Sequence, residues 1–500
     1  MANRTATPKT TRVERSMFAV ESTGIEVIHG SHRKGAAKEL FWPWFAANVS
    51  ILALSYGAFA LGFGISFWQA LFAGLFGIVF SFLLCGLVAL AGRRGSAPTM
   101  VLSRAAFGIR GNRLPAAMSW LLTVGWETVL TILATLATAA VFEKLGWGGG
   151  NLTKALALAA VGSLIVVAGV IGFDLIMRLE TAITIVTAVL TVIYILLSID
   201  EVNWSAVEAL PSGTSQQVIG ATVFLMTGFG LGWVNLAADY SRYLPRNTPA
   251  KGVIGWTTFG GSIAPLLLFA FGLMLAGSSE ELSAAIALDP IGALAETLPS
   301  WFLLPFIVVA VLGLIGGAVL DIYSSGLALL AAGVRVRRHI AALIDGVIML
   351  LGTIYVVFIA EDTFLTQFMG FLITLGVPIA AWAGIMLADL ATRRRDYADD
   401  ELFNPRGRYG NIQWVPIGIL VVCTLIGWGL VTNASASWLE WQGYLLEPLG
   451  LGGKEGEWAY ANLGVLFALV AAFVAQLILG RGRVRMQESV DDGNEELMRA

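Results

Sequence analysis

Twelve long apolar segments separated by polar loops constrain this chain of 500 residues more than any other feature. Each is long enough to cross the hydrocarbon core of a bilayer, which takes about 20 residues as a helix. Threading them through a membrane puts all but three of the 31 Lys and Arg residues on one side. Because basic loops stay in the cytoplasm during insertion, we predict an all-α membrane protein with both termini cytoplasmic. The segments lie at about 42–64, 67–92, 114–142, 153–173, 179–199, 218–238, 252–277, 301–333, 339–360, 364–391, 412–434 and 460–480.

The composition excludes several classes of protein. Hydrophobic residues make up 57% of the chain and charged residues 13%, whereas a soluble domain carries about 25% charged residues. Cys85 and Cys423 fall inside predicted segments and the histidines fall outside them, so no metal-ligand spacing appears. No nucleophile–base pair is evident, and we predict no enzyme activity, no cofactor and no metal. The expected partners are a small-molecule substrate and the lipid bilayer, not a nucleic acid; the sequence leaves the oligomeric state open.

The segments divide into two groups of five, followed by two more. The expected organisation is a cytoplasmic tail at 1–41, a ten-helix core at 42–391 with repeats at about 42–199 and 218–391, a cytoplasmic loop at 392–411, helices 11 and 12 at 412–480, and a cytoplasmic tail at 481–500.

Helix-breaking residues gather in the first segment of each repeat. Asn48, Ser50 and Ser55 lie in the middle of segment 1, and Gly228 and Gly230 lie in segment 6. Interrupted helices at matching positions of two repeats indicate a binding site near the midplane of a transporter, because unwound backbone is tolerated only where it is buried in protein or lines a cavity. The alternative is that the glycines only allow close helix packing.

Glu127 and Asp321 are carboxyl groups inside segments 3 and 8, at matching places in the two repeats. A charged side chain at this depth costs about 2.5–3.5 kcal/mol on insertion scales, so such residues are candidates for function. We expect each to carry a coupling proton or to contact the substrate; the alternative is a structural hydrogen-bond acceptor. Asp345 in segment 9 is instead expected to pair with the arginines at 335–338.

Aromatic residues stand beside the expected breaks and the segment 3 acid. Trp126, Phe229 and Trp233 could bury a flat heterocycle, since stacking on an aromatic side chain contributes about 1–3 kcal/mol per base in nucleic-acid complexes. The alternative for each is ordinary packing or a place in the aromatic belt at the membrane surface.

Four groups of motifs extend over roughly residues 20–415. They are Gly-Ile-Glu at 24–26 with Trp-Pro-Trp-Phe-Ala-Ala-Asn at 42–48; Arg-Ala-Ala-Phe-Gly-Ile-Arg-Gly-Asn-Arg-Leu-Pro at 104–115 with Gly-Trp at 125–126; Ala-Asp-Tyr-Ser-Arg-Tyr at 238–243; and Phe-Leu at 364–365 with Pro378, Ala-Asp at 388–389 and Gly-Arg-Tyr-Gly at 407–410. Together they resemble the nucleobase–cation–symport-1 transporters, most closely the cytosine/purine permease branch.

The resemblance implies a leucine-transporter-like fold, with a five-plus-five inverted repeat and two C-terminal helices. Trp126 matches the family's stacking tryptophan, and the matching aromatic of helix 6 falls at Phe229, Gly230 or Trp233. Leu130 departs from the pattern, because relatives often place a polar residue there. Arg104 and Asp239 are candidates for a contact that closes the cytoplasmic side. The expected substrate-binding residues are Asn48, Ser50, Ser55, Trp126, Glu127, Leu130, Phe229, Gly230, Trp233, Gly317, Asp321 and Gln367.

The resemblance also implies uptake of a nucleobase driven by a cation. Relatives often carry hydroxyl or amide side chains that help to bind sodium where this chain has Gly316, Gly317 and Ala318, and this difference favours protons carried by Glu127 and Asp321. We predict a symporter of the cell membrane that imports a nucleobase such as cytosine or a purine by alternating access. The alternatives are a sodium-coupled carrier of hydantoin or allantoin and, from a different class, a passive channel or a non-transporting receptor.

Overall fold

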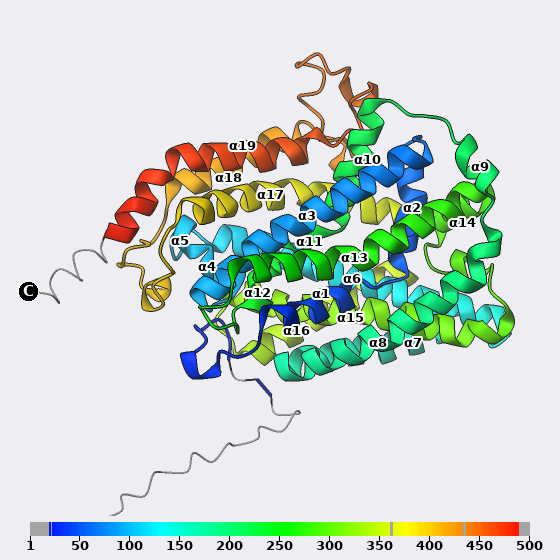
Figure 1. The fold of residues 1–500 in the computed structure, drawn as a ribbon, viewed down its shortest axis with the longest axis horizontal. Coiled ribbons are helices and arrows are strands. Elements are labelled where there is room, and N and C mark those ends of the chain that lie inside the picture. Colours follow the sequence, from blue (N-terminus) through cyan, green and yellow to red (C-terminus); the bar gives the residue numbers. More distant parts are fainter. Residues whose placement is uncertain (1–19, 22, 361–363, 434–436, 490–500) are drawn as a thin grey trace, which may run out of the picture.

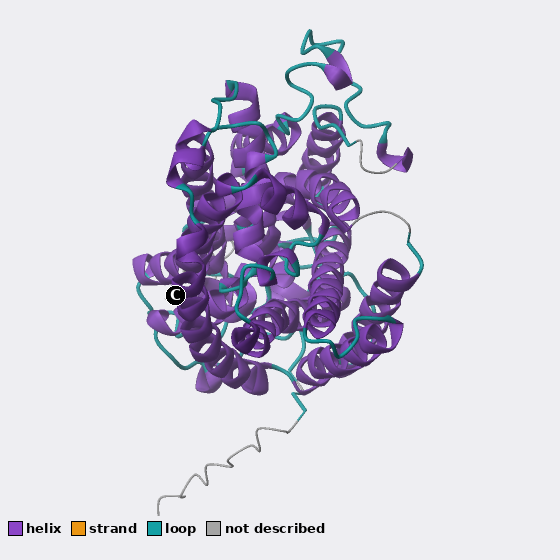
Figure 2. Ribbon diagram, turned by 90° about the vertical axis from the view of Figure 1, so that its right-hand side faces the viewer, coloured by secondary structure: helices purple, strands orange, loops and turns teal. Residues whose placement is uncertain are grey.

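A computed structural model describes residues 20–21, 23–360, 364–433 and 437–489, and every regular element in these ranges is a helix (Figure 1). Viewed nearly along the bundle, the helices pack around one another with no strand in the described part of the chain (Figure 2). The long helices are α3 (Phe67–Gly95), α6 (Arg113–Lys144), α7 (Asn151–Ile171), α8 (Phe173–Ser198), α10 (Ser215–Gly228), α13 (Ala250–Ser278), α15 (Leu303–Ala331), α16 (Arg338–Phe358), α17 (Phe364–Thr392), α18 (Trp414–Trp428) and α19 (Leu463–Leu479).

Shorter helices form the breaks and the loops. They are α1 (Phe41–Asn48), α2 (Leu52–Leu61), α4 (Thr99–Leu102), α5 (Arg104–Phe107), α9 (Trp204–Ala209), α11 (Gly230–Trp233), α12 (Ala237–Ser241) and α14 (Glu280–Leu288).

Nine helical units among the described residues are long and apolar enough to cross a membrane, judged by length and composition. Two bent pairs pass the same test together: Ala37–Asn48 meets α2 at 65°, and α19 meets Arg481–Ser489 at 50°. Helix α18 is apolar but has only 15 residues. Each predicted segment overlaps one of these units, and the predicted all-α membrane fold is confirmed.

The predicted boundary that matters for the site is the start of segment 5, and it is wrong. The fifth segment was expected at 179–199, but α8 begins at Phe173, directly after α7 ends at Ile171. Gly172 alone connects the two helices and has a φ of 106°, a conformation that favours glycine. Glu180 therefore lies about two turns inside a membrane helix rather than at its entrance.

Two membrane helices are interrupted near their middle, as the breakers in the sequence predict. The first is broken between α1 and α2, where Val49 has ψ 63°, and the second between α10 and α11, where Phe229 has φ −115° and ψ −109°. Lipid cannot satisfy backbone groups freed by such breaks, so protein must. Helix α3 does so at the second break: Ser81 Oγ accepts from Gly230 N at 3.1 Å, and Cys85 Sγ donates to Gly230 O at 2.9 Å.

The long helices pack in pairs around these breaks. Helix α6 runs along α15, and α3 runs along α13. Helix α2 approaches α13 so closely that a Cβ added at Gly272 would lie 2.0 Å from Leu54 O, a contact that only glycine permits. Helix α1 contacts α8, α13 and α15, and so lies between the two pairs.

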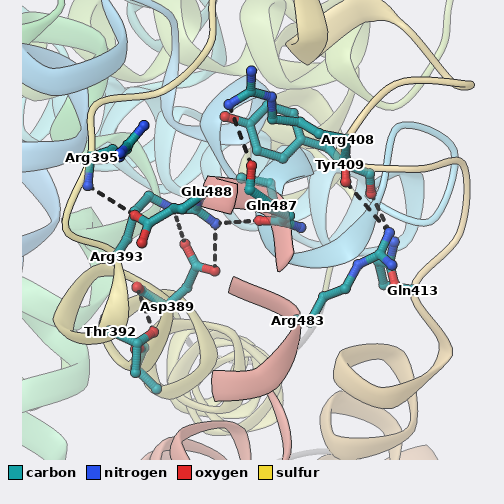
Figure 3. Close-up of polar contacts among 12 residues, drawn as sticks. Asp389, Thr392, Arg393, Arg395, Arg408, Tyr409, Gln413, Arg483, Gln487 and Glu488 are labelled. Carbon is teal, nitrogen blue, oxygen red and sulfur yellow. Dashed lines mark hydrogen bonds and ion pairs between the residues drawn. The ribbon is translucent and has the colours of Figure 1, made fainter. Parts of the chain in front are cut away.

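The arginine-rich loops gather at one end of the bundle, on the left in Figure 1, which we call the basic end. The other end, with α9 and α14 on the right, we call the opposite end. At the basic end the segment Arg481–Ser489 folds onto the loop after α17 (Figure 3). There Arg393 pairs with Asp389 at 2.9 Å and donates to Gln487 Oε1 at 2.8 Å.

Candidate functional site

A cavity of about 50 Å³ lies between the two helix breaks and α6. Because it is formed where two helices lose regular hydrogen bonding, backbone as well as side chains can face a solute there. Its lining residues are Ala47, Asn48, Ser50, Leu52, Ala53 and Tyr56 from the first broken helix, Trp126 and Leu130 from α6, and Gly228, Phe229 and Trp233 from the second broken helix.

Trp126 forms the wall on the α6 side. Its indole meets Phe368 and Phe371 of α17 at centroid distances of 5.6 and 6.2 Å and interplanar angles of 75° and 80°. These perpendicular contacts fix the plane of the ring. Trp126 Nε1 has no hydrogen-bond partner among the described residues. It points toward Gly232, where an added Cβ would lie 3.1 Å away.

Phe229 and Tyr56 form an aromatic wall from the two broken helices. Their ring centroids are 4.6 Å apart at an interplanar angle of 45°. The Tyr56 hydroxyl donates to Gly228 O at 3.4 Å, at the end of α10. Tyr56 was missing from the expected site. It follows the cavity residues Leu52 and Ala53 at spacings of four and three, so an aromatic residue one turn after the predicted break is the sequence signal that could have found it.

Polar groups reach the cavity from the first break. Asn48 Nδ2 donates to Trp44 O at 2.8 Å, which fixes the orientation of the amide. Ser50 Oγ accepts from Leu52 N at 3.3 Å at the start of α2. A planar solute therefore meets aromatic faces on its sides and amide, hydroxyl and backbone groups at its edge.

The structure places other predicted site residues away from this lining. Ser55 Oγ donates to Pro290 O, and Gly230 is bound to α3 through both backbone groups. Gly317 lies behind Leu130, because a Cβ added there would be 2.8 Å from Leu130 Cδ1. Gln367 lies in α17, but its side chain is outside the described part of the chain.

Glu127 is fully buried but faces away from the cavity, toward α15 and α16. Its electrostatic neighbours are Asp345 and Asp321. Ser325 also lies close but hydrogen-bonds Asp345 Oδ2 at 2.9 Å, and neither Glu127 oxygen has a partner among the described residues. Glu127, Asp345 and Asp321 thus form a buried acidic cluster behind the cavity wall.

The prediction that Asp345 pairs with the arginines at 335–338 is wrong. Asp345 is fully buried and accepts from Trp120 Nε1 at 2.8 Å. The α16 helix turns this carboxyl group inward, while Arg338 reaches the end of α7, donating to Gly169 O at 2.8 Å.

Asp321 of α15 and Glu180 of α8 are buried acids, and both neighbour Tyr240. Asp321 is 1% exposed and Glu180 is fully buried. Asp321 Oδ2 and both carboxyl oxygens of Glu180 have no hydrogen-bond partner among the described residues. Tyr240 of α12 is an electrostatic neighbour of both acids. Glu180 was missed from the sequence because the start of α8 was placed six residues too late, at 179 rather than at Phe173.

A network around Glu21 closes the basic end. Glu21 Oε1 lies 3.9 Å from Arg242 Nη2, and Glu21 Oε2 lies 3.7 Å from Arg338 Nε. The Tyr243 hydroxyl donates to Glu21 at 3.0 Å, and burial raises the pKa of this hydroxyl to about 12, so it stays protonated at neutral pH. Arg242 also donates to the Tyr323 hydroxyl at 2.7 Å. One N-terminal carboxylate thereby connects α8, α12, α15 and α16.

The expected contact between Arg104 and Asp239 is wrong. Arg104 donates to Leu402 O at 3.1 Å and lies over the Phe403 ring, in the loop after α17. Asp239 instead accepts from both Thr99 N and Thr99 Oγ1, at 2.7 and 2.8 Å. The two residues bind different segments of the basic end.

A hollow of about 630 Å³ opens at the opposite end. Phe59, which lines this hollow, packs against Tyr56, which lines the cavity, with ring centroids 5.6 Å apart. The hollow is lined by Ala58, Phe59, Gly62, Phe63, Thr214, Gln216, Gln217, Ala287, Gly456, Glu457, Tyr460 and Ala461. The Phe59 ring therefore connects the wall of the cavity with the lining of the hollow.

A membrane bundle with two broken helices around a central cavity defines a multi-pass transporter, not an enzyme. The chain belongs to the family of permeases for cytosine/purines, uracil, thiamine and allantoin, whose pattern it matches over residues 27–443. The family resemblance stated from the sequence is thus confirmed. No group of three or more His, Cys, Asp or Glu side chains that could hold a metal ion occurs in the described ranges.

Individual relatives are distant but extend along much of the chain. A candidate purine-cytosine permease of Bacillus subtilis (strain 168) is 24% identical over 417 residues, which cover 81% of this chain and 87% of the relative. A vitamin B6 transporter of Saccharomyces cerevisiae is 26% identical over 274 residues, 52% of this chain and 45% of that protein. The solved structure of Mhp1, a nucleobase–cation–symport-1 transporter closed with bromovinylhydantoin bound, has a TM-score of 0.69 at 18% identity and covers 94% of this chain and 96% of Mhp1. This last similarity shows the leucine-transporter-like fold.

Proposed function

We propose that this chain is a symporter that imports a nucleobase, such as cytosine or a purine, by alternating access with protons as the coupling ion. The observation that carries the proposal is the cavity between the two helix breaks, with Trp126 on one side and the Tyr56–Phe229 pair on another. A flat, weakly polar ring buries its faces against such walls, and each stacked base contributes about 1–3 kcal/mol in comparable complexes.

The edge of the base would meet the first break. Asn48 and Ser50 supply amide and hydroxyl groups, and the residues between α1 and α2 supply backbone groups without helical partners. Leu130 adds an apolar surface beside Trp126. This combination of aromatic walls and a polar edge fits a planar heterocycle.

Transport would proceed by rocking one group of helices against another. The first group holds α1, α2, α3, α10–α12 and α13, and the second holds α6, α7, α15 and α16. Contacts within each group are extensive, as in the α3–α13 and α6–α15 pairs. In the two-repeat organisation expected from the sequence, the first group takes helices 1, 2, 6 and 7 and the second takes helices 3, 4, 8 and 9. Gln367 on α17 remains a proposed gate residue.

The proposal places the protein in the cell membrane with the basic end and both termini in the cytoplasm. The Glu21 network would then close the cytoplasmic side, and the hollow at the opposite end would face outward. Buried acids would carry the coupling proton, with Glu127 and Asp321 as the two that the sequence indicates. A sodium-coupled carrier of hydantoin or allantoin is the alternative that the test must exclude.

A competition panel in proteoliposomes tests this function. Labelled cytosine and labelled hypoxanthine are offered under an imposed pH gradient, with sodium replaced by choline, against unlabelled adenine, uracil, allantoin and hydantoin. We expect uphill accumulation of one labelled base, strongest competition by nucleobases and collapse with an uncoupler. Uptake that never exceeds the external concentration would indicate a channel or receptor, and uptake that requires sodium would indicate the alternative carrier.

A further inference from the structure

We propose that Glu180 of α8 is the group that binds and releases the transported proton, an inference that rests on the transport function proposed above. Glu180 is fully buried, and neither carboxyl oxygen has a hydrogen-bond or ion-pair partner among the described residues. A dry protein interior does not tolerate an isolated carboxylate, so a buried and unpartnered carboxyl group is neutral or is compensated by a cation. A proton is the simplest such cation.

Glu180 faces the end of the first half-helix. A Cβ added at Gly316 of α15 would lie 3.4 Å from Glu180 Oε2 and 3.1 Å from Ala46 O, so both oxygens reach the same face of that glycine. Ala46 lies in the last turn of α1, where carbonyl groups lack the amide partners of a continuing helix and carry the negative end of its dipole. An ionised carboxylate there would be repelled, whereas a protonated one can donate to a carbonyl oxygen.

The surroundings favour a proton over a metal ion. On α15 the residue that faces this point is Gly316, which supplies no side-chain oxygen. Hard metal cations take about six to eight oxygen ligands, whereas a carboxylic acid needs one acceptor. One carboxyl group beside a few backbone carbonyls therefore fits a proton best.

Among the described residues, no basic side chain pairs with Glu180. Helix α1 contributes no ionisable residue, α15 contributes Asp321 and Tyr323, and α12 contributes Asp239, which binds Thr99, and Tyr240. Arg178 and Asp174 lie on α8 itself, but both are exposed on the outer face of the helix. Helix α7 brings only Lys154, near its start, and η3 (Ile199–Glu201) brings its two acids at the far end of α8. Tyr240 and Asp321 are therefore the titratable side chains with which Glu180 would share the proton.

A polar stripe leads away from Glu180 along α8. Thr184, Thr187, Thr191, Tyr194 and Ser198 follow at spacings of three or four residues, and all are buried. The hydroxyls of Thr184 and Thr191 have no hydrogen-bond partner in the described ranges. In an apolar helix, a buried hydroxyl row that ends at a carboxyl group is suited to pass a proton from the opposite end to Glu180.

Position in the transport cycle separates Glu180 from Glu127. The neighbours of Glu127 are α15 and α16, which belong with α6 to one proposed moving group. Glu180 instead contacts α1, which belongs to the other group and carries Asn48 into the cavity. Rocking therefore changes the surroundings of Glu180, while those of Glu127 move as a unit.

The test compares Glu180→Gln with wild type and with Asp174→Asn, a control on the exposed face of the same helix. Labelled cytosine and hypoxanthine are the probes, in sodium-free proteoliposomes. With one proton per base, a gradient of about one pH unit sustains an about ten-fold concentration ratio. We expect Glu180→Gln to lose this ratio but to keep equilibrium exchange of the base, and Asp174→Asn to keep both.

A second measurement does not depend on transport. Binding of the base to detergent-purified wild type should take up one proton, measured with an indicator dye in weak buffer, and Glu180→Gln should bind the base without that uptake. Unchanged proton uptake or unchanged accumulation in Glu180→Gln overturns the proposal. A variant that binds no base also overturns it, since Glu180 is then needed for the site itself. If wild type transports neither probe, the proposed function fails instead.

Discussion

The ring of Tyr56 lies 4.6 Å from the ring of Phe229, although the two residues are 173 positions apart in the chain. Phe229 stands at the second break and Tyr56 in α2, just after the first, and the Tyr56 hydroxyl donates to Gly228 O at 3.4 Å. The pair therefore joins the two broken helices directly, in one wall of the cavity. A solute bound there contacts both at once, which gives a physical route from binding to helix movement.

Trp126→Ala should weaken base binding without unfolding the protein. The indole is one wall of the cavity, and removing a stacking ring costs about 1–3 kcal/mol, or roughly 5- to 150-fold in affinity. Trp126→Phe should keep most of the affinity because it retains a flat face. Equilibrium binding of labelled base to purified protein measures the change, and Trp414→Ala, at a side chain that is 74% exposed, is the control. Equal affinity in Trp126→Ala and wild type would contradict the stacking role.

Gly317→Ala should reduce the volume of the cavity by displacing Leu130 into it. The added Cβ would lie 2.8 Å from Leu130 Cδ1, so Leu130 must move toward the cavity that it lines. Overpacking of this kind costs about 1–3 kcal/mol, and we expect it to appear as weaker base binding. Leu130→Ala in the same chain should restore affinity, whereas additive losses in the double variant would exclude the contact. Gly418→Ala is the control, since its Cβ would meet no atom within 4 Å.

The fold was predictable because the bilayer leaves a chain few choices. Backbone groups in lipid must be satisfied within the segment, so apolar segments of sufficient length become helices. The same constraint makes breakers informative: Asn48 and Ser50 in one helix and Gly228 beside Phe229 in another mark the two interruptions that the structure contains. Trp126 was identified by its position in a family motif, and it lines the cavity.

The site residues that were not predicted correctly depended on which face of each helix points toward the cavity. Glu127 and Trp126 are adjacent in sequence, so on a helix they point about 100° apart, and only Trp126 lines the cavity. Glu180 was hidden by the wrong start of α8, although the row from Glu180 through Thr184 and Thr187 at helical spacing was present in the sequence. Asp345 was assigned to nearby arginines because sequence distance does not show that α16 turns the carboxyl group toward Trp120.

Glu21→Gln should make the basic end easier to open. Removing the charge weakens the ion pairs with Arg242 and Arg338 and the hydrogen bond from the Tyr243 hydroxyl, and a hydrogen bond to a charged group is worth about 1.5–3 kcal/mol. We expect faster amide hydrogen exchange in α12 and in the last turns of α15, measured by mass spectrometry on purified protein. Glu39→Gln, at an exposed residue of the same N-terminal region, is the control. Unchanged exchange would show that the Glu21 network does not hold this end closed.

Gln487→Ala should lower thermal stability while leaving base binding intact. Gln487 accepts from Arg393 Nη2 at 2.8 Å and donates to Ala105 O at 2.9 Å, so it connects the C-terminal segment to two loops of the basic end (Figure 3). The side chain is 2% exposed, and removing it leaves buried polar groups unpaired at a cost of about 1–3 kcal/mol. The unfolding midpoint of purified protein in detergent should therefore fall below those of wild type and of Ser489→Ala, whose side chain is exposed.

The cavity lies at the helix breaks rather than at this end, so affinity of the Gln487→Ala variant for the base should not change. A loss of affinity would show that the C-terminal segment acts on the site, and an unchanged midpoint would show that its contacts do not hold the loops.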